Sequence, residues 1–224
     1  MNQMDPVTIG MKLGMFFVPF LFALCFHEFA HGLVAKWRGD DTAERAGRLS
    51  LNPFVHADLV GTWILPISAL VFGSPFFFGW AKPVPVNSRN LRRPKQDMFW
   101  VALAGPASNI LLALISTVAL GFLFAFARQG GTGEALVELL KTFIMVNMFL
   151  AVFNLIPVHP LDGGKVIEPF LPIRWNMWLD QNQSALSMGL LVFMLLAGPV
   201  LAVPVTMATQ LLLHASVHIA SMIG

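Results

Sequence analysis

The chain has 224 residues, of which 56% are hydrophobic and only 12% are Asp, Glu, Lys or Arg, about half the charged fraction of an ordinary soluble domain. This composition excludes a soluble globular domain. Because several apolar runs reach the roughly 20 residues that cross a bilayer, it predicts a polytopic membrane protein surrounded by the lipid bilayer. The net charge of +2 comes from 14 basic residues scattered over loops, which excludes nucleic acid as a partner, and a single cysteine excludes a cysteine-rich zinc module.

Residues 13–37 predict the first membrane-spanning helix, which ends at a basic and glycine-containing stretch. The alternating residues 48–52 that follow predict an extended segment. Residues 58–72 are too short for a comfortable crossing and contain Gly61 and Pro66, so they predict a re-entrant helix that enters and leaves the membrane on one side. Residues 82–87 are broken by prolines and predict a second extended segment.

Three later apolar runs, residues 98–127, 135–156 and 184–202, predict further spans, and residues 205–222 form a last run of marginal length. The predicted fold is therefore an all-α polytopic membrane protein with five to six membrane helices, a re-entrant segment and short membrane-associated β-strands. We find no hydrophilic block long enough for a second domain. The chain is predicted to be one domain, residues 1–224, with a core at 13–170 and C-terminal helices at 184–222.

Charge placement predicts the orientation of this fold. If residues 58–80 dip in and out on one side, eleven basic residues share that side and three lie on the other. The positive-inside rule then makes the first side cytoplasmic. A full crossing by residues 58–80 would remove most of this asymmetry, so the re-entrant interpretation is favoured.

The first predicted span contains an H-E-x-x-H motif, His27-Glu28-Phe29-Ala30-His31. On a helix, the i, i+4 spacing puts both imidazoles on one face, as two ligands of a tetrahedral zinc require. Glu28 is rotated by about 100° from His27, so it can reach a zinc-activated water without being a ligand. A chance match is the alternative, but three ionisable side chains in a spanning helix are costly without partners or a metal.

Asp162 is the candidate for the third ligand of this metal. It lies in the segment from Asn154 to Gly164, where prolines and glycines end the span of residues 135–156. Irregular backbone at membrane depth is tolerated only inside protein or beside a water-filled cavity. The alternative is a turn residue in an Asp-Gly loop.

These paired motifs resemble those of the site-2 proteases, a family of intramembrane zinc metalloproteases. The family joins an H-E-x-x-H helix to a later N-x-x-P-x-x-x-L-D-G segment, and the matching residues here are His27, Glu28, His31, Asn154, Pro157, Leu161, Asp162 and Gly163. Ala104-Gly105-Pro106 and the stretch from Gly47 to Pro53 extend the resemblance over residues 13–170. Without a PDZ or CBS-like module, the chain resembles the compact prokaryotic branch.

The resemblance implies an enzyme of the prokaryotic cell membrane that cleaves membrane proteins, single-span proteins above all. The charge placement predicts that its active site lies nearer the cytoplasmic side. The resemblance also implies Zn²⁺ as cofactor, Glu28 as general base, and Asn154 as a residue that binds the substrate backbone. For Asn154 a helix-end amide cap is an equal alternative. Roles for His56 and His159 stay open.

Two other functions fit an intramembrane metal site. A transporter would also have broken helices and buried carboxylates, but this sequence lacks paired broken segments in two halves. An inactive scaffold is disfavoured because every catalytic residue of the motif is present.

Overall fold

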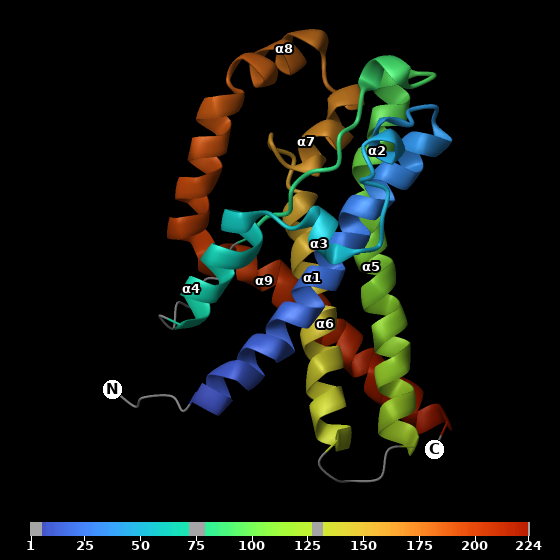
Figure 1. The fold of residues 1–224 in the computed structure, drawn as a ribbon, viewed down its shortest axis with the longest axis vertical. Helices are drawn as coiled ribbons and strands as arrows, with labels where there is room; N and C mark the ends of the chain where they lie inside the picture. Colours follow the sequence, from blue (N-terminus) through green and yellow to red (C-terminus); the bar gives the residue numbers. More distant parts are fainter. Residues whose placement is uncertain (1–5, 72–78, 127–131, 224) are drawn as a thin grey trace.

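The computed structural model describes residues 6–71, 79–126 and 132–223, and these residues form helices and irregular connections (Figure 1). In chain order the helices are α1 (Pro6–Trp37), α2 (Thr42–Arg45), α3 (Pro53–His56), α4 (Leu65–Val71), α5 (Pro94–Phe126), α6 (Thr132–Asn154), α7 (Asp162–Ile167), α8 (Ile173–Gln181) and α9 (Gln183–Ile223). A π-helical turn at Leu59–Ile64 leads into α4, and 3₁₀ turns lie at Ser88–Asn90 and Glu168–Phe170.

Within the described ranges, four helices are long and apolar enough to cross a membrane. They are Leu13–Trp37 in α1, Pro94–Phe126 in α5, Gly133–Asn154 in α6 and Ala202–Ile223 in α9. The chain is thus a multi-pass membrane protein with an all-α fold, as composition predicted. The three spans predicted before residue 160 are confirmed to within a few residues, and the described ranges contain four candidate spans where five to six membrane helices were expected.

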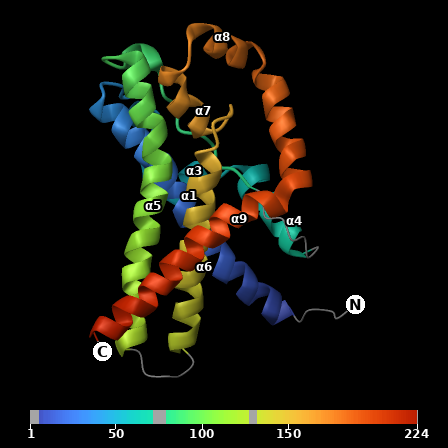
Figure 2. The ribbon, with the colours of Figure 1, turned by 180° about the vertical axis from the view of Figure 1, so that it is seen from behind.

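The C-terminal region differs from the prediction. Residues 184–202 and 205–222 were expected as separate helices, but they form one helix, α9 (Gln183–Ile223). Figures 1 and 2 show that α9 changes direction along its length and that its second part runs diagonally across α5 and α6. The sequence has Pro199 and Pro204 in this region, and proline in a long apolar helix often bends the helix without ending it.

The expected short β-strands are also wrong for the part of the chain that the structure describes. Residues 48–52 are irregular, and residues 82–87 are extended without a strand partner. Pairing is limited to one antiparallel bridge between Ala57 and Ala81. Pro83 and Pro85 carry no N–H group, so a hydrogen-bonded ladder cannot continue through them.

The predicted re-entrant segment leaves the bundle and returns to its starting point. Asp58 caps its first turn by accepting hydrogen bonds from the N–H groups of Val60 and Gly61 at 3.0 and 2.7 Å. On the return, the Trp80 N–H donates to the Gly61 carbonyl oxygen at 3.2 Å, and the Lys82 N–H to that of His56 at 2.8 Å. The two ends of the segment therefore lie side by side, and the membrane side on which they lie stays a prediction.

The helices α1, α5 and α6 pack against one another and are crossed by α9 (Figure 2). Three apolar clusters hold them together. The first joins α1 to α6 and contains Phe20, Ala23, Leu24, Ala81, Val146 and Leu150. The second joins α1 to α5 and contains Ala35, Leu91 and Val101. The third joins α5 to α6 and contains Ala113, Leu120 and Ile144, with Leu212 and Leu213 of α9 against it. This packing turns the H-E-x-x-H face of α1 towards α5 and the start of α7.

A buried carboxylate ties the loop after α1 to the segment before α5. Asp40 is fully buried and accepts hydrogen bonds from the Asn87 N–H at 2.6 Å, the Asn90 side chain at 2.9 Å and the Thr42 N–H at 3.1 Å. Burial raises the pKa of Asp40, but the hydrogen bonds from Thr42, Asn90 and Asn87 together outweigh burial and hold the pKa below its usual value. Asp40 is therefore ionised at neutral pH and stabilises this end of the bundle.

We expect Asp40→Ala to destabilise the protein by roughly 2–4 kcal/mol, because it leaves buried N–H groups without an acceptor. The matched control is Asp41→Ala, which breaks an exposed ion pair with Arg45 and should cost less than about 1 kcal/mol. Thermal unfolding of the detergent-purified proteins measures both. Because the pKa of Asp40 is lowered, its stabilisation should be complete above the usual carboxyl pKa and disappear as the pH falls through the lower folded value. Equal losses for the two variants would contradict this role.

Candidate metal centre

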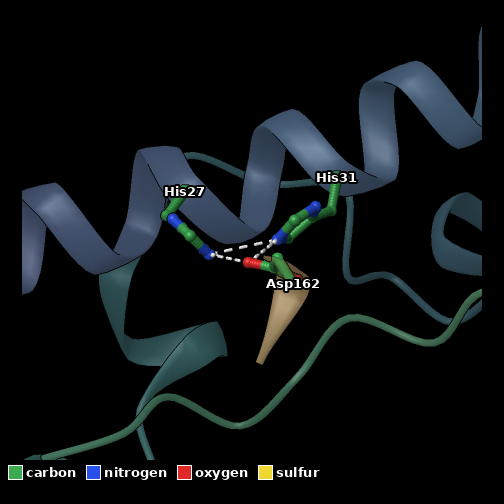
Figure 3. Close-up of side chains that lie close together, drawn as sticks. All are labelled: His27, His31 and Asp162. Carbon is green, nitrogen blue, oxygen red and sulfur yellow. Dashed lines mark hydrogen bonds and ion pairs between the residues drawn. The ribbon is translucent and has the colours of Figure 1, made fainter. Parts of the chain in front are cut away.

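The three predicted ligands meet at one point. His27 and His31 lie one turn apart in the C-terminal part of α1, and both side chains are buried. Figure 3 shows that the two imidazoles project from the same face of α1 and that Asp162, the first residue of α7, points at both. The structure thus joins residues that lie 135 positions apart in the chain.

The distances between the three ligand atoms fit a metal ion. His27 Nε2 lies 3.1 Å from Asp162 Oδ2, His31 Nε2 lies 3.3 Å from the same oxygen, and the two Nε2 atoms are 3.1 Å apart. Four-coordinate zinc with bonds of about 2.0–2.1 Å separates its ligand atoms by about 3.4 Å. Among the described residues this is the one group of three or more His, Cys, Asp and Glu side chains close enough to share a metal.

Hydrogen bonds prepare both imidazoles for a metal. His31 Nδ1 lies 2.7 Å from the Val101 carbonyl oxygen, and His27 Nδ1 lies 2.6 Å from the Asn109 side-chain oxygen. A carbonyl oxygen can only accept, so each Nδ1 carries the proton and each Nε2 keeps a lone pair.

Two buried glycines allow α7 to begin next to the end of α6. A Cβ atom at Gly163 would overlap the carbonyl oxygens of Ile156 and Leu155, and one at Gly164 would overlap the ring of His159. His159 is therefore buried against the turn that carries Asp162, without being one of the three grouped side chains. The glycines are what bring Asp162 within reach of the histidines.

Glu28 lies beside the three ligand atoms. Its side chain is buried, and Oε2 accepts a hydrogen bond from the Val84 N–H at 2.8 Å. Val84 belongs to the extended residues 82–87, so this segment lies against the H-E-x-x-H motif. A backbone donor therefore orients the carboxylate that was predicted to be the base.

A cavity of about 350 Å³ opens onto this group. It is lined by His27, Glu28, His31, Pro83, Val84, Val86, Met98, Val101, Ala102, Asn154, Pro160, Asp162 and Lys165. Asn154, the last residue of α6, also donates from Nδ2 to the Leu150 carbonyl oxygen at 3.0 Å. The amide thus bonds to its own helix and faces the cavity, which leaves both of its predicted roles compatible with the structure.

His56, the other histidine whose role the sequence left open, has a hydrogen-bond partner in the backbone. His56 is buried, and its Nε2 lies 2.7 Å from the Ser50 carbonyl oxygen. Asp58, two residues further on, caps the turn at Leu59–Ile64. His56 is not among the residues that line the cavity.

Sequence reasoning did not identify three groups that position the centre: the Val84 N–H, the Val101 carbonyl and the Asn109 side chain. The first two are backbone atoms and leave no mark on the sequence. Asn109 did carry a signal, because an amide within the apolar residues 98–127 needs a partner at membrane depth.

Comparisons with known proteins place the chain in a family. Residues 127–198 match the sequence profile described as "Peptidase family M50". Two bacterial proteins named "Putative zinc metalloprotease" are similar over most of their length. YwhC of Bacillus subtilis (strain 168) is 38% identical over 172 residues, which are 76% of this chain and 74% of that protein. Rip2 of Mycobacterium tuberculosis (strain ATCC 35801) is 30% identical over 196 residues, 86% of this chain and 71% of that protein.

The chain belongs to peptidase family M50. This is the site-2 protease family whose resemblance the motifs predicted, and its members are zinc metalloproteases. "Zinc metalloprotease MJ0392" of Methanocaldococcus jannaschii is 29% identical over 107 residues, 47% of this chain and 29% of that protein. No solved structure matches the chain. The M50 assignment makes zinc the metal that His27, His31 and Asp162 could hold.

The helix α5 approaches the centre most closely at Gly105. A Cβ atom there would overlap the His31 ring and lie 2.7 Å from His27 Cε1. We expect Gly105→Ala to push the imidazoles apart and to lower the zinc content of the purified protein to well below one ion per chain, with little change in helix content. The control is Gly14→Ala on α1, where an added Cβ meets nothing within 4 Å. Full zinc content in Gly105→Ala, measured by elemental analysis, would show that the close approach is not needed.

Proposed function

We propose that this M50 protein is an intramembrane zinc metalloprotease that hydrolyses peptide bonds within or near transmembrane segments of membrane-protein substrates. The observation that carries the proposal is the cavity where Glu28 lines the same wall as the converging atoms of His27, His31 and Asp162. The motif-bearing helix α1 is itself long and apolar enough to cross a membrane. Peptide hydrolysis at membrane depth is the chemistry that this combination supports best.

His27, His31 and Asp162 would hold the zinc ion through two imidazoles and one carboxylate. When bound, zinc lowers the pKa of a water molecule to near neutrality and polarises the carbonyl of the scissile bond. Glu28 takes the proton of the attacking water and later gives it to the leaving amine. The Val84 N–H holds Glu28 Oε2, so the other carboxylate oxygen is available for this transfer.

The substrate has to be unwound, because a helical peptide keeps its backbone groups in its own hydrogen bonds. Residues 82–87 belong to no strand of the described structure, and Pro83, Val84 and Val86 line the cavity. An unwound peptide can add beside this segment and present its carbonyl to the metal. Asn154 faces the same cavity and is placed to hydrogen-bond the peptide backbone. A single-span protein is the substrate class that needs the least rearrangement.

We further propose that the site faces the cytoplasmic side of a prokaryotic cell membrane, within a single domain whose core is residues 13–170. The support is the asymmetric distribution of basic residues, together with the contacts of residues 79–82 with the start of the re-entrant segment. A transporter or scaffold with an intramembrane metal site is the competing function. M50 membership and the placement of Glu28 on the cavity wall, where a transport site has no use for it, favour the protease.

Glu28→Gln is the variant that tests the chemistry. The amide has nearly the same shape and can still accept from the Val84 N–H, but it cannot take a proton. We expect zinc content to stay at the wild-type level and cleavage of a reconstituted single-span protein to fall by roughly 10²–10⁴-fold or more. A gel-based cleavage assay and zinc analysis of the same preparation measure both.

Two controls accompany this experiment. Glu44→Gln makes the same chemical change at an exposed residue that pairs with Lys36, and it should cleave normally. His27→Ala should lose zinc and cleavage together. Near wild-type cleavage by Glu28→Gln with zinc in place would remove Glu28 from the mechanism, and a zinc-loaded wild type that cleaves no membrane protein would favour the competing functions.

The orientation of the protein in the membrane is tested by cysteine labelling at Ser88, an exposed residue that follows the re-entrant segment. We expect Ser88→Cys to react with an impermeant thiol reagent only from the cytoplasmic side. Glu134→Cys, at the opposite end of the bundle near the start of α6, should react only from outside (Figure 1). The native Cys25 is buried and should stay unlabelled. Labelling of Ser88→Cys only from outside would overturn the proposed topology.

A further inference from the structure

Behind the metal centre, a chain of side-chain hydrogen bonds crosses three helices. His27 Nδ1 on α1 lies 2.6 Å from Asn109 Oδ1 on α5, and Asn109 Nδ2 donates to Asn147 Oδ1 on α6 at 2.9 Å. Asn109 Nδ2 also donates to the Ala23 carbonyl oxygen at 3.1 Å, and Asn147 Nδ2 donates to that of Phe143 at 2.8 Å. Each of these side-chain amide atoms therefore has a partner.

The two backbone carbonyls decide which atom donates and which accepts in each of these hydrogen bonds. A carbonyl oxygen can only accept, so the Phe143 oxygen requires Nδ2 of Asn147, which turns Oδ1 of Asn147 towards Asn109. The Ala23 oxygen and Asn147 Oδ1 both accept, so they require Nδ2 of Asn109. Asn109 Oδ1 is then the atom that faces His27, and His27 Nδ1 has to be the donor. The lone pair of His27 is left on Nε2, the atom that points at Asp162.

The burial of the two asparagines indicates that these hydrogen bonds do more than hold the helices together. Asn109 on α5 and Asn147 on α6 are both fully buried. A buried amide costs free energy relative to an apolar residue of similar size unless every hydrogen bond is made. An apolar pair would hold these helices together without that requirement, and what it could not do is select one tautomer of His27.

We propose that Asn109 is a positioning residue for the zinc ligand His27, and that Asn147 acts through it by fixing the orientation of its amide. The inference rests on the proposed role of His27 as a ligand. Partners of this kind, bonded to the outer nitrogen of a metal-bound histidine, set its tautomer and ring orientation, and their loss typically lowers metal affinity by about 10–100-fold. His31 has the equivalent partner in the Val101 carbonyl, which no side-chain substitution removes.

The test separates the acceptor of Asn109 from its donors. Asn109→Asp keeps an oxygen for the His27 Nδ1–H but loses both donor bonds, to Ala23 and Asn147. Asn109→Leu loses the acceptor and the donors in a side chain of similar size. Thr117→Val is the matched control, because it removes another buried side-chain hydrogen bond of α5, to the Ala113 carbonyl oxygen, that does not reach His27.

The measurement is the zinc dissociation constant of the purified chain at about pH 8, by competition with a chelator of known affinity, beside the melting temperature of the zinc-free protein. We expect Asn109→Leu to bind zinc about 10–100-fold more weakly, while Asn109→Asp and Thr117→Val stay within about threefold of the wild type. A purely structural role for Asn109 predicts that Asp and Leu weaken binding equally, since both remove the donor bonds. Equal losses, or no loss in Asn109→Leu, would overturn the proposal.

Asn147→Leu covers the case in which Asn109→Leu does not fold. This substitution removes one of the two acceptors that fix the Asn109 amide. Zinc binding should therefore weaken measurably, but by less than in a variant without the Asn109 oxygen. Wild-type affinity in Asn147→Leu would overturn the relay through α6. His27→Ala serves as the reference variant. If it keeps wild-type zinc affinity, the proposed ligand set is wrong. If it loses zinc while Asn109→Leu binds zinc normally, only the positioning role of Asn109 is refuted.

Discussion

The burial of polar side chains at the centre is the constraint on which this structure depends. Each polar atom of the centre has to be satisfied by another protein atom or by a ligand. The Nδ1 atoms of His27 and His31 use a side-chain and a backbone oxygen. That leaves two ring nitrogens and one oxygen of Asp162, 3.1–3.3 Å apart, facing each other. A shared proton can join two of these atoms, whereas one cation would satisfy all three.

Features that act over short distances along the chain could be predicted from the sequence. The i, i+4 spacing of His27 and His31 fixes their common face on any helix, and the apolar runs that became α1, α5 and α6 are long enough to be unambiguous. Asp162 was predicted from its setting at the end of a span, and the structure explains that setting through the close approaches at Gly163 and Gly164. The partners of the centre could not be predicted in this way, because they come from residues 56, 70 and 82 positions away and two of them are backbone groups.

Proline bears on two of the differences between the predicted and the observed fold. Residues 184–202 and 205–222 were predicted as two helices, yet the helix continues through Pro199 and Pro204, because an unwound turn in apolar surroundings would expose backbone groups. In the segment of residues 82–87, two prolines were compatible with extended backbone but remove the donors that a strand pair needs. Single-sequence reasoning identifies where a proline limits the backbone and cannot tell how the neighbouring elements respond.

The contacts of the centre define the register between two antiparallel helices. Val101, Gly105 and Asn109 are spaced four residues apart on α5 and so share one face, as His27 and His31 do on α1. Asn109 meets His27, Val101 meets His31, and Gly105 lies between them where a side chain would collide with both rings. If α5 were shifted by one turn, Gly105 would lie opposite a histidine that needs an acceptor. Asn109 would then lie at the position where no side chain fits. The positioning of the imidazoles of His27 and His31 and the packing of α1 on α5 are therefore the same structural requirement.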